Sequence, residues 1–81
     1  MSKQLNEAYQ YLIYDTLREY KELIRELKEF ILENPDVSTA HNNLGVAYKE
    51  IGQFRNAFNA FKRAIEINPQ DPTPWYNIGK L

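Results

Sequence analysis

The chain contains no cysteine and a single histidine among its 81 residues. Without cysteine there is neither a disulfide framework nor a Cys-based zinc site, and one histidine cannot build a His-rich metal site. A chain of this length forms one domain at most, and it buries only a little over ~60% of the surface that its unfolded form exposes. Stability must come from packing alone, so we expect a single domain over residues 1–81 that needs no metal and no cofactor.

The chain also lacks a large net charge and a long apolar run. Ten Lys and Arg residues face 11 Asp and Glu residues, which leaves a net charge of -1 at pH 7. This balance creates no field to attract DNA or an anionic membrane, and no uncharged run approaches the roughly 20 residues of a spanning helix. Residues 1–20 show no signal-peptide pattern, because polar side chains interrupt the apolar ones. We expect a soluble, cytoplasmic protein that binds neither nucleic acid nor membrane.

Glycine and proline are scarce and unevenly placed. None of the 3 Gly and 4 Pro residues precedes Pro35. Because the residue before a proline disfavours helical geometry, the pairs Asn34-Pro35 and Asn68-Pro69 each predict the end of a helix. No stretch alternates apolar and polar residues as a half-buried strand does. The sequence therefore predicts an all-α fold.

Candidate caps mark where the next helices begin. Asp36 or Ser38 is suited to cap the helix after the first stop, since their side chains accept hydrogen bonds from backbone N–H groups. Asp71 followed by Pro72 is typical of an N-cap with proline at the first helical position.

An internal repeat relates the first Asn-Pro pair to the second. One constant offset along the chain carries Asn34-Pro35 onto Asn68-Pro69. The same offset relates Lys28 to Lys62, Ile31 to Ile65, Asn43 to Asn77, Leu44 to Ile78 and Gly45 to Gly79. A period of this length is typical of a helix–turn–helix unit that stacks on copies of itself, as in an α-solenoid.

The repeat resembles the tetratricopeptide repeat (TPR) family. With Ser38 as the first position, the small and bulky residues that the family favours fall at Leu44, Gly45, Tyr48, Ala57, Phe61, Ala64 and Pro69. His41 stands where the family usually has tryptophan, and Trp75 restores that residue in the next unit. The resemblance implies a complete repeat over residues 38–71 and the first helix of a truncated repeat over residues 72–81.

The spacing of apolar residues supports a packed helical hairpin within this repeat. Apolar and small residues recur on one face of a helix over about 38–51, and again over about 54–67. Gly52 ends the first helix, and the short link that it forms with Gln53 makes the two helices antiparallel neighbours.

Residues 1–34 allow two interpretations, a long N-terminal helix or a divergent repeat. A divergent hairpin would place Tyr11 where a glycine is wanted and Arg18 at the turn. A single helix instead has a charged stripe through residues 15–18 and an apolar seam at Ile13, Leu17, Tyr20, Ile24, Leu27 and Ile31. We favour one helix, because no glycine or proline interrupts it.

A helix of this length would be ~45 Å long and would extend past the hairpin. Its first half, and the last helix, would then leave apolar side chains exposed, and contiguous apolar patches usually mark association. We expect a homodimer or higher oligomer, formed through the long helix, the last helix or an exchange of elements between protomers. The candidate residues for self-association are Leu5, Tyr9, Leu12, Ile13, Leu17 and Trp75.

The TPR resemblance also implies a binding site for a protein or peptide partner. In this family the inner face of the first helices usually forms a groove. The matching positions are Thr39, Asn42, Asn43, Val46 and Lys49 in the complete repeat, and Thr73, Tyr76, Asn77 and Lys80 in the next.

The chemistry of these side chains suits an extended peptide. Asn43 and Asn77 offer both a donor and an acceptor to a peptide backbone, and Lys49 and Lys80 attract an acidic segment or a carboxylate. Alternatively, both asparagines only support the neighbouring helix.

The carboxylate clamp of some TPR members is incomplete. Asn42 and Val46 replace the expected lysine and asparagine, and Thr73 replaces a lysine. We therefore do not expect capture of a peptide's C-terminal carboxylate.

No group of residues has the pattern of a catalytic site. His41 has no Cys partner, and the carboxylates alternate with Lys and Arg. Arg55, Lys62 and Arg63 lack the interleaved aromatics of a nucleic-acid surface. We expect no enzymatic activity. Two functions stay open: an interaction module or scaffold of TPR type, and a self-assembling fragment whose long helix occupies its own groove.

Overall fold

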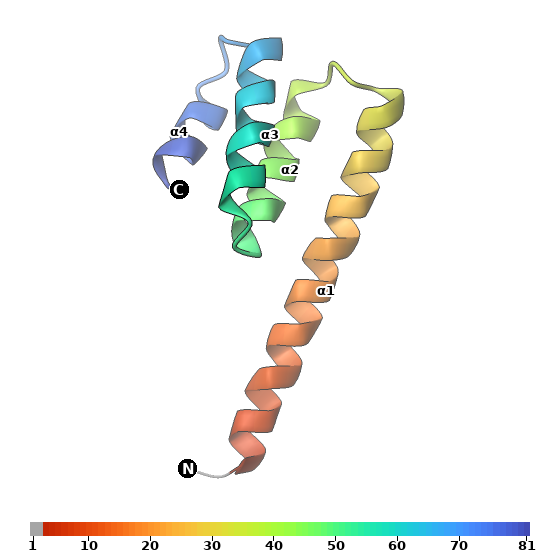
Figure 1. Cartoon of the computed structure of the whole chain (residues 1–81), viewed down its shortest axis with the longest axis vertical. Coiled ribbons are helices and arrows are strands. Elements are labelled where there is room, and N and C mark those ends of the chain that lie inside the picture. Colours follow the sequence, from red (N-terminus) through yellow and green to blue (C-terminus); the bar gives the residue numbers. More distant parts are fainter. Residues whose placement is uncertain (1–2) are drawn as a thin grey trace.

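A computed structural model describes residues 3–81 of the chain, and the side chains of Glu7 and of residues 10–81. This part folds into four helices without strands: α1 (Lys3–Glu33), α2 (Ser38–Glu50), α3 (Phe54–Ile67) and α4 (Thr73–Gly79). The predicted all-α, repeat-like fold is confirmed (Figure 1). None of the described helices combines the length and the hydropathy that a membrane span needs.

The segment that precedes Pro35 contains one helix rather than a hairpin. α1 is 31 residues long and runs without interruption through residues 15–18, where a hairpin would have to turn. Exposed ion pairs follow its charged stripe, with Arg18 3.9 Å from Asp15 and Arg25 3.5 Å from Glu22. Each pair adds only ~0.3–0.5 kcal/mol. The absence of a breaker and many such small contributions favour the continuous helix.

The hairpin of α2 and α3 forms the centre of the molecule. Gly52 joins the two helices with a φ of 81°, in the left-handed region that glycine adopts without strain. Phe61 of α3 is fully buried, and its ring fills the space that the missing side chain of Gly45 leaves. The second half of α1 completes this core, with Ile24 buried and Tyr20 and Leu27 packed beside it.

The predicted caps differ in their outcome. The prediction that Asp36 or Ser38 caps α2 is wrong: no described side chain makes a capping hydrogen bond to this helix. The Ser38 hydroxyl instead donates to the backbone oxygen of Ala64 at 3.3 Å, and the Asp36 carboxylate lies 3.6 Å from Arg63. Both side chains therefore contact α3 rather than the N–H groups of α2.

At the last helix the predicted positions are wrong by one residue: Pro72, not Asp71, is the N-cap residue of α4, which begins at Thr73. Asp71 still binds the start of the helix from the position before the cap. The Asp71 carboxylate accepts a hydrogen bond from the backbone N–H of Thr73 at 3.0 Å, and Pro72 stands between the two residues. This bond satisfies one of the N–H groups that a helix start leaves free.

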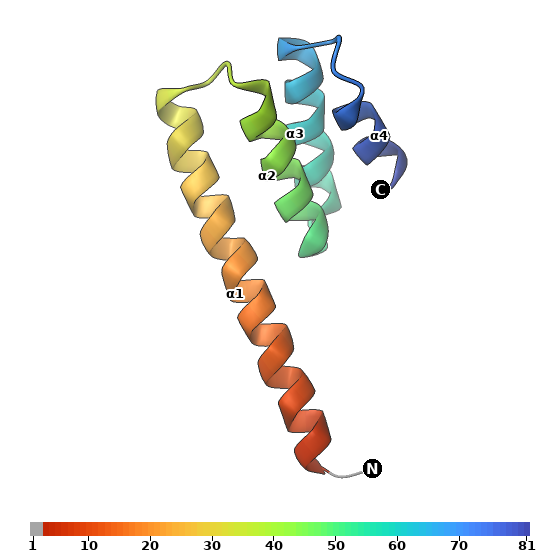
Figure 2. The same ribbon diagram turned by 180° about the vertical axis from the view of Figure 1, so that it is seen from behind.

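The first half of α1 extends well past the hairpin (Figures 1 and 2). The molecule is elongated as a result, with extents of 50 × 28 × 16 Å. Tyr11, Leu12, Ile13 and Tyr14 are each more than half exposed. The side chains of Leu5 and Tyr9, which we also expected in this patch, lie outside the described residues.

Candidate functional site

The first helices of the two units, α2 and α4, contact each other across the end of the molecule. The Asn77 side-chain amide donates a hydrogen bond to the side-chain oxygen of Asn42 at 3.0 Å, and the bond is partly buried. This polar link joins residues that are far apart in the sequence and connects α4 to α2. The structure therefore brings two of the predicted site residues together directly.

The remaining predicted residues follow the same two helices. Positions three, four and seven residues apart share one face of a helix, so the predicted set forms one stripe on α2 and one on α4, with Lys80 at the C-cap just after α4. Thr39, Asn43, Thr73, Tyr76 and Lys80 are exposed, and Asn42, Val46, Lys49 and Asn77 are half-buried. The contact between Asn42 and Asn77 makes the two stripes neighbours. Together we call these nine residues the α2–α4 face.

The α2–α4 face includes a hollow at the start of α4. It has a volume of about 390 Å³, and Pro72, Thr73 and Tyr76 line it. The Lys80 ammonium lies 4.6 Å from the centre of the Tyr76 ring, a distance at which a cation and an aromatic face attract each other. An aromatic wall and a positive charge therefore lie next to one another on α4.

The two asparagines related by the internal repeat do not have equivalent environments. Asn77 uses its amide to bind Asn42, whereas Asn43 is exposed on α2. The interpretation that an asparagine supports the neighbouring helix thus fits Asn77. The sequence offers no sign of this difference, because the repeat offset makes the two positions look alike.

Lys49 has an acidic neighbour. Its ammonium lies 3.8 Å from a carboxylate oxygen of Glu50 at the end of α2. This ion pair partly neutralises the charge that Lys49 would present to an acidic partner, so Lys80 is the better placed of the two lysines.

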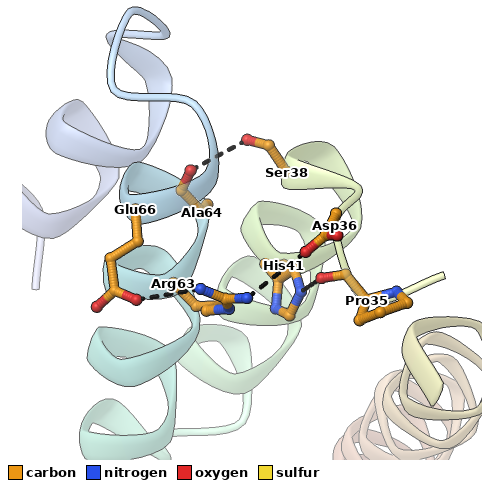
Figure 3. A network of polar contacts seen from close by, with 7 residues as sticks. All are labelled: Pro35, Asp36, Ser38, His41, Arg63, Ala64 and Glu66. Atoms are coloured by element: carbon orange, nitrogen blue, oxygen red, sulfur yellow. Dashed lines mark hydrogen bonds and ion pairs between the residues drawn. The ribbon is translucent and has the colours of Figure 1, made fainter.

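The histidine has a structural environment. His41 is only 8% exposed, and its Nε2–H donates to the backbone oxygen of Pro35 at 2.9 Å (Figure 3). It ties the loop before α2 to the hairpin. Among the described residues, no three His, Asp or Glu side chains converge as a metal site would require.

One residue of the predicted basic cluster on α3, Arg63, is part of the same polar network. Arg63 lies 3.6 Å from Asp36 and 3.2 Å from Glu66, so it links α3 to the loop that follows α1 (Figure 3). Arg63 therefore connects two elements of the fold.

Two further hollows were not predicted from the sequence. An apolar one of about 320 Å³ lies between α1 and α2, and Ile31, Leu32, His41 and Leu44 line it together with Lys28. Histidine is smaller than the tryptophan expected at position 41. This difference in size is the feature of the sequence that could have indicated the apolar hollow. The other, of about 450 Å³, follows the exposed face of α1 from Tyr14 to Arg25.

Comparison with known proteins identifies the central unit. Residues 38–71 match the family described as tetratricopeptide repeat. The match has the bounds that the sequence resemblance gave, which confirms the resemblance for this segment of the chain. None of the curated proteins and none of the solved structures matches the chain. The family is generally non-catalytic, and the repeat indicates a protein–protein interaction module.

Proposed function

We propose that the chain binds a peptide or a partner helix on its α2–α4 face, as an interaction module or scaffold of TPR type. The observation that supports this most is the bond between Asn42 and Asn77, because it makes one continuous surface from two helices that belong to successive units. No catalytic step is part of the proposal, and we place the module in the cytoplasm.

The side chains of this face define the chemistry of the partner. Asn43 offers a donor and an acceptor that match the backbone of an extended peptide. The hollow at Pro72, Thr73 and Tyr76 has room for a side chain of that peptide. Lys80 favours an acidic group nearby. We therefore propose an extended peptide that carries an acidic residue close to an apolar or aromatic one.

Substitutions on the face should weaken binding of such a peptide. We expect Tyr76→Ala to raise the Kd at least about tenfold, equivalent to about 1.4 kcal/mol, because it removes a wall of the hollow and the ring under Lys80. Asn43→Ala should cost about 1 kcal/mol, the net value of one hydrogen bond. The measurement is calorimetric titration with peptides selected from a random-sequence display library on the immobilised chain.

Matched controls are present elsewhere in the chain. Tyr14 is 66% exposed and Tyr76 is 64% exposed, so Tyr14→Ala removes the same side chain from a similarly open place. Asn59→Ala does the same for an exposed asparagine on α3. Equal losses of affinity in the control and test variants, or a library that yields no binding peptide, would contradict the proposed site.

A second candidate function is self-assembly through α1. The exposed apolar run from Tyr11 to Tyr14 favours it, because a solvent-facing patch of this kind usually meets a partner. Within one chain the described residues of α1 contact α2 but not α4. If the long helix occupies a groove of this protein, the groove must therefore belong to a second copy.

Charged substitutions in or next to this apolar run of α1 should dissociate such an oligomer. We expect the chain to sediment as more than a 9.6 kDa monomer at tens of micromolar. Ile13→Asp and Leu17→Asp should each return it to the monomer mass, because a buried carboxylate without a partner is costly. A wild-type monomer throughout this range would exclude self-assembly as the function.

A further inference from the structure

The hollow between α1 and α2 is separate from the α2–α4 face, since none of its lining residues belongs to that face. Its volume of about 320 Å³ lies at the lower end of the ~300–1,000 Å³ that small-molecule pockets span. Ile31 and Leu32 line it from α1, and Leu44 and the ring of His41 line it from α2. Leu32 is 83% exposed, the highest value among the described large apolar side chains. Apolar surface therefore faces solvent at a concave site.

Lys28 is the charged residue of this hollow. The residues three and four positions away from it along α1 are Ile24, Arg25, Ile31 and Leu32. No acidic side chain thus lies at the helical spacing that an ion pair with Lys28 would need. None of the ion pairs between described side chains includes this lysine. A ligand in the hollow therefore meets a positive charge that pairs with no described carboxylate of the chain.

The internal repeat shows which side chain accompanies the same residues in the next unit. The offset that relates the two Asn-Pro pairs carries four lining residues of the hollow onto residues of α3 and α4: Lys28 onto Lys62, Ile31 onto Ile65, Leu44 onto Ile78 and His41 onto Trp75. The lysine and the two aliphatic residues keep their character, whereas an indole ring replaces the imidazole. The second unit therefore combines this set of residues with a larger aromatic ring than α2 supplies.

A ring at this position stays partly open to solvent. Trp75 is 58% exposed at its place on α4. The hollow beside His41 is likewise open to solvent, since the Leu32 side chain at its wall is exposed. An aromatic ligand there can stack its ring on the imidazole and on apolar walls while it keeps a polar group in water.

We propose that the hollow between α1 and α2 binds a small aromatic carboxylate, as a free molecule rather than as part of a protein. The ring lies against His41, Ile31 and Leu44, and the carboxylate pairs with the Lys28 ammonium. A neutral aromatic compound would leave the lysine without a counter-ion, and an inorganic anion would leave the apolar walls in contact with water. The lining residues suit one ring with one acidic group, whereas a stable protein interface engages about 20–30 residues a side.

A titration followed by nuclear magnetic resonance tests this site. The probe is indole-3-acetate, which joins the ring of tryptophan to a carboxylate, added to the isotope-labelled whole chain. We expect amide signals around Lys28, Leu32 and His41 to shift, with a Kd of about 0.1–1 mM, as suits a small ligand that is only partly enclosed. Indole-3-acetamide has the same ring without the charge and should bind about fivefold more weakly. Acetate, which lacks the ring, should shift none of these signals.

Substitutions of exposed residues separate the two parts of the site. Lys28→Gln should raise the Kd of indole-3-acetate about fivefold and leave that of indole-3-acetamide unchanged. Lys62→Gln is the matched control, because it removes the repeat counterpart of Lys28 from α3 and should change neither value. Leu32→Ala should raise both Kd values at least about threefold, since it removes an apolar wall. Leu12→Ala, at another exposed position of α1, should change neither.

His41→Trp tests the origin of the hollow. The tryptophan ring should take the place of the ligand's ring, so we expect this variant to lose binding of indole-3-acetate. The substitution also removes the hydrogen bond between His41 and the backbone oxygen of Pro35. Circular dichroism therefore checks that the helices are intact, and Leu32→Ala tests the same wall without a change in a buried residue.

The outcomes that would overturn the proposal are distinct. The first is an absence of shifts around the hollow with up to about 10 mM indole-3-acetate, well above the expected Kd. Another is equal affinity for indole-3-acetate and indole-3-acetamide, because the carboxylate would then have no role. A third is binding at the hollow of a short peptide that contains tryptophan and aspartate while indole-3-acetate does not bind, because the partner would then be a protein. None of these results depends on peptide binding at the α2–α4 face.

Discussion

Replacing Phe61 by alanine should lower the free energy of unfolding by about 3–5 kcal/mol, the usual cost of deleting a buried aromatic ring. Phe61 has no exposed surface, and its ring fills the gap at Gly45 where α2 and α3 approach each other. A domain of this size has a total stability of only about 4–12 kcal/mol. The substitution should therefore remove a large part of the stability, and urea unfolding followed by circular dichroism measures it.

Phe58 supplies a matched control for this prediction. It lies on the same helix but is 45% exposed, so Phe58→Ala removes the same ring from a partly solvated place. We expect that variant to lose about 1 kcal/mol or less, because little buried surface is given up. Similar unfolding midpoints for the two variants would contradict the packing of the hairpin around Phe61.

The second large effect is expected at Gly45. Alanine normally stabilises a helix by about 1 kcal/mol relative to glycine. At Gly45, however, the added Cβ would lie 2.5 Å from Phe61 Cε1 and 2.6 Å from Cδ1. Overpacking of this kind costs about 1–3 kcal/mol. We therefore expect Gly45→Ala to lower the unfolding midpoint in urea, against the trend of helix propensity.

The same substitution to alanine at Gly79 tests whether contact with Phe61 explains the effect expected at Gly45. No described neighbour surrounds Gly79 within 4 Å in the single chain, so Gly79→Ala should be neutral or stabilising when measured at a concentration where the chain is monomeric. The double variant Gly45→Ala with Phe61→Leu should lose less stability than the sum of its parts, since a smaller side chain leaves room for the methyl group. A Gly45→Ala chain as stable as Gly79→Ala would contradict the close approach of α2 to α3.

The sequence predicted the parts of the fold that depend on spacing along the chain. The repeat offset and the resemblance to the TPR family located Gly45, Phe61 and the other packing positions of the repeat, because a stacked unit needs the same residue sizes at the same places. The single helix α1 followed from the absence of glycine and proline before Pro35. Both features are local or periodic, so they can be predicted from the sequence without knowledge of the tertiary contacts.

The parts that could not be predicted depend on contacts between elements. Ser38 and Asp36 have the side chains of helix caps, but in the folded chain they contact Ala64 and Arg63 on α3. Nothing in the spacing along the sequence shows these contacts. They depend on how closely the loop before α2 approaches α3, which is a property of the folded molecule.

The candidate site likewise has some features that the sequence predicted and others that it did not. The repeat register indicated which stripe of α2 and which of α4 to examine, and the structure places these stripes side by side. The repeat register did not indicate that Asn77 binds Asn42, nor that Lys49 has Glu50 as a neighbour. Three of the nine predicted residues, Asn42, Asn77 and Lys49, have side-chain partners within the chain, and the contacts that we propose with a peptide centre on Asn43, Tyr76 and Lys80.

The central claim, that the α2–α4 face binds an extended peptide, is tested most directly by nuclear magnetic resonance. An isotope-labelled chain would be titrated with a peptide selected from the display library, and the change in each backbone amide signal followed. We predict that the largest changes lie at Asn43, Val46, Tyr76 and Lys80, with the exposed segment 11–14 of α1 unaffected. Changes confined to α1 or to the outer side of α3, with the α2–α4 face unmoved, would contradict the claim.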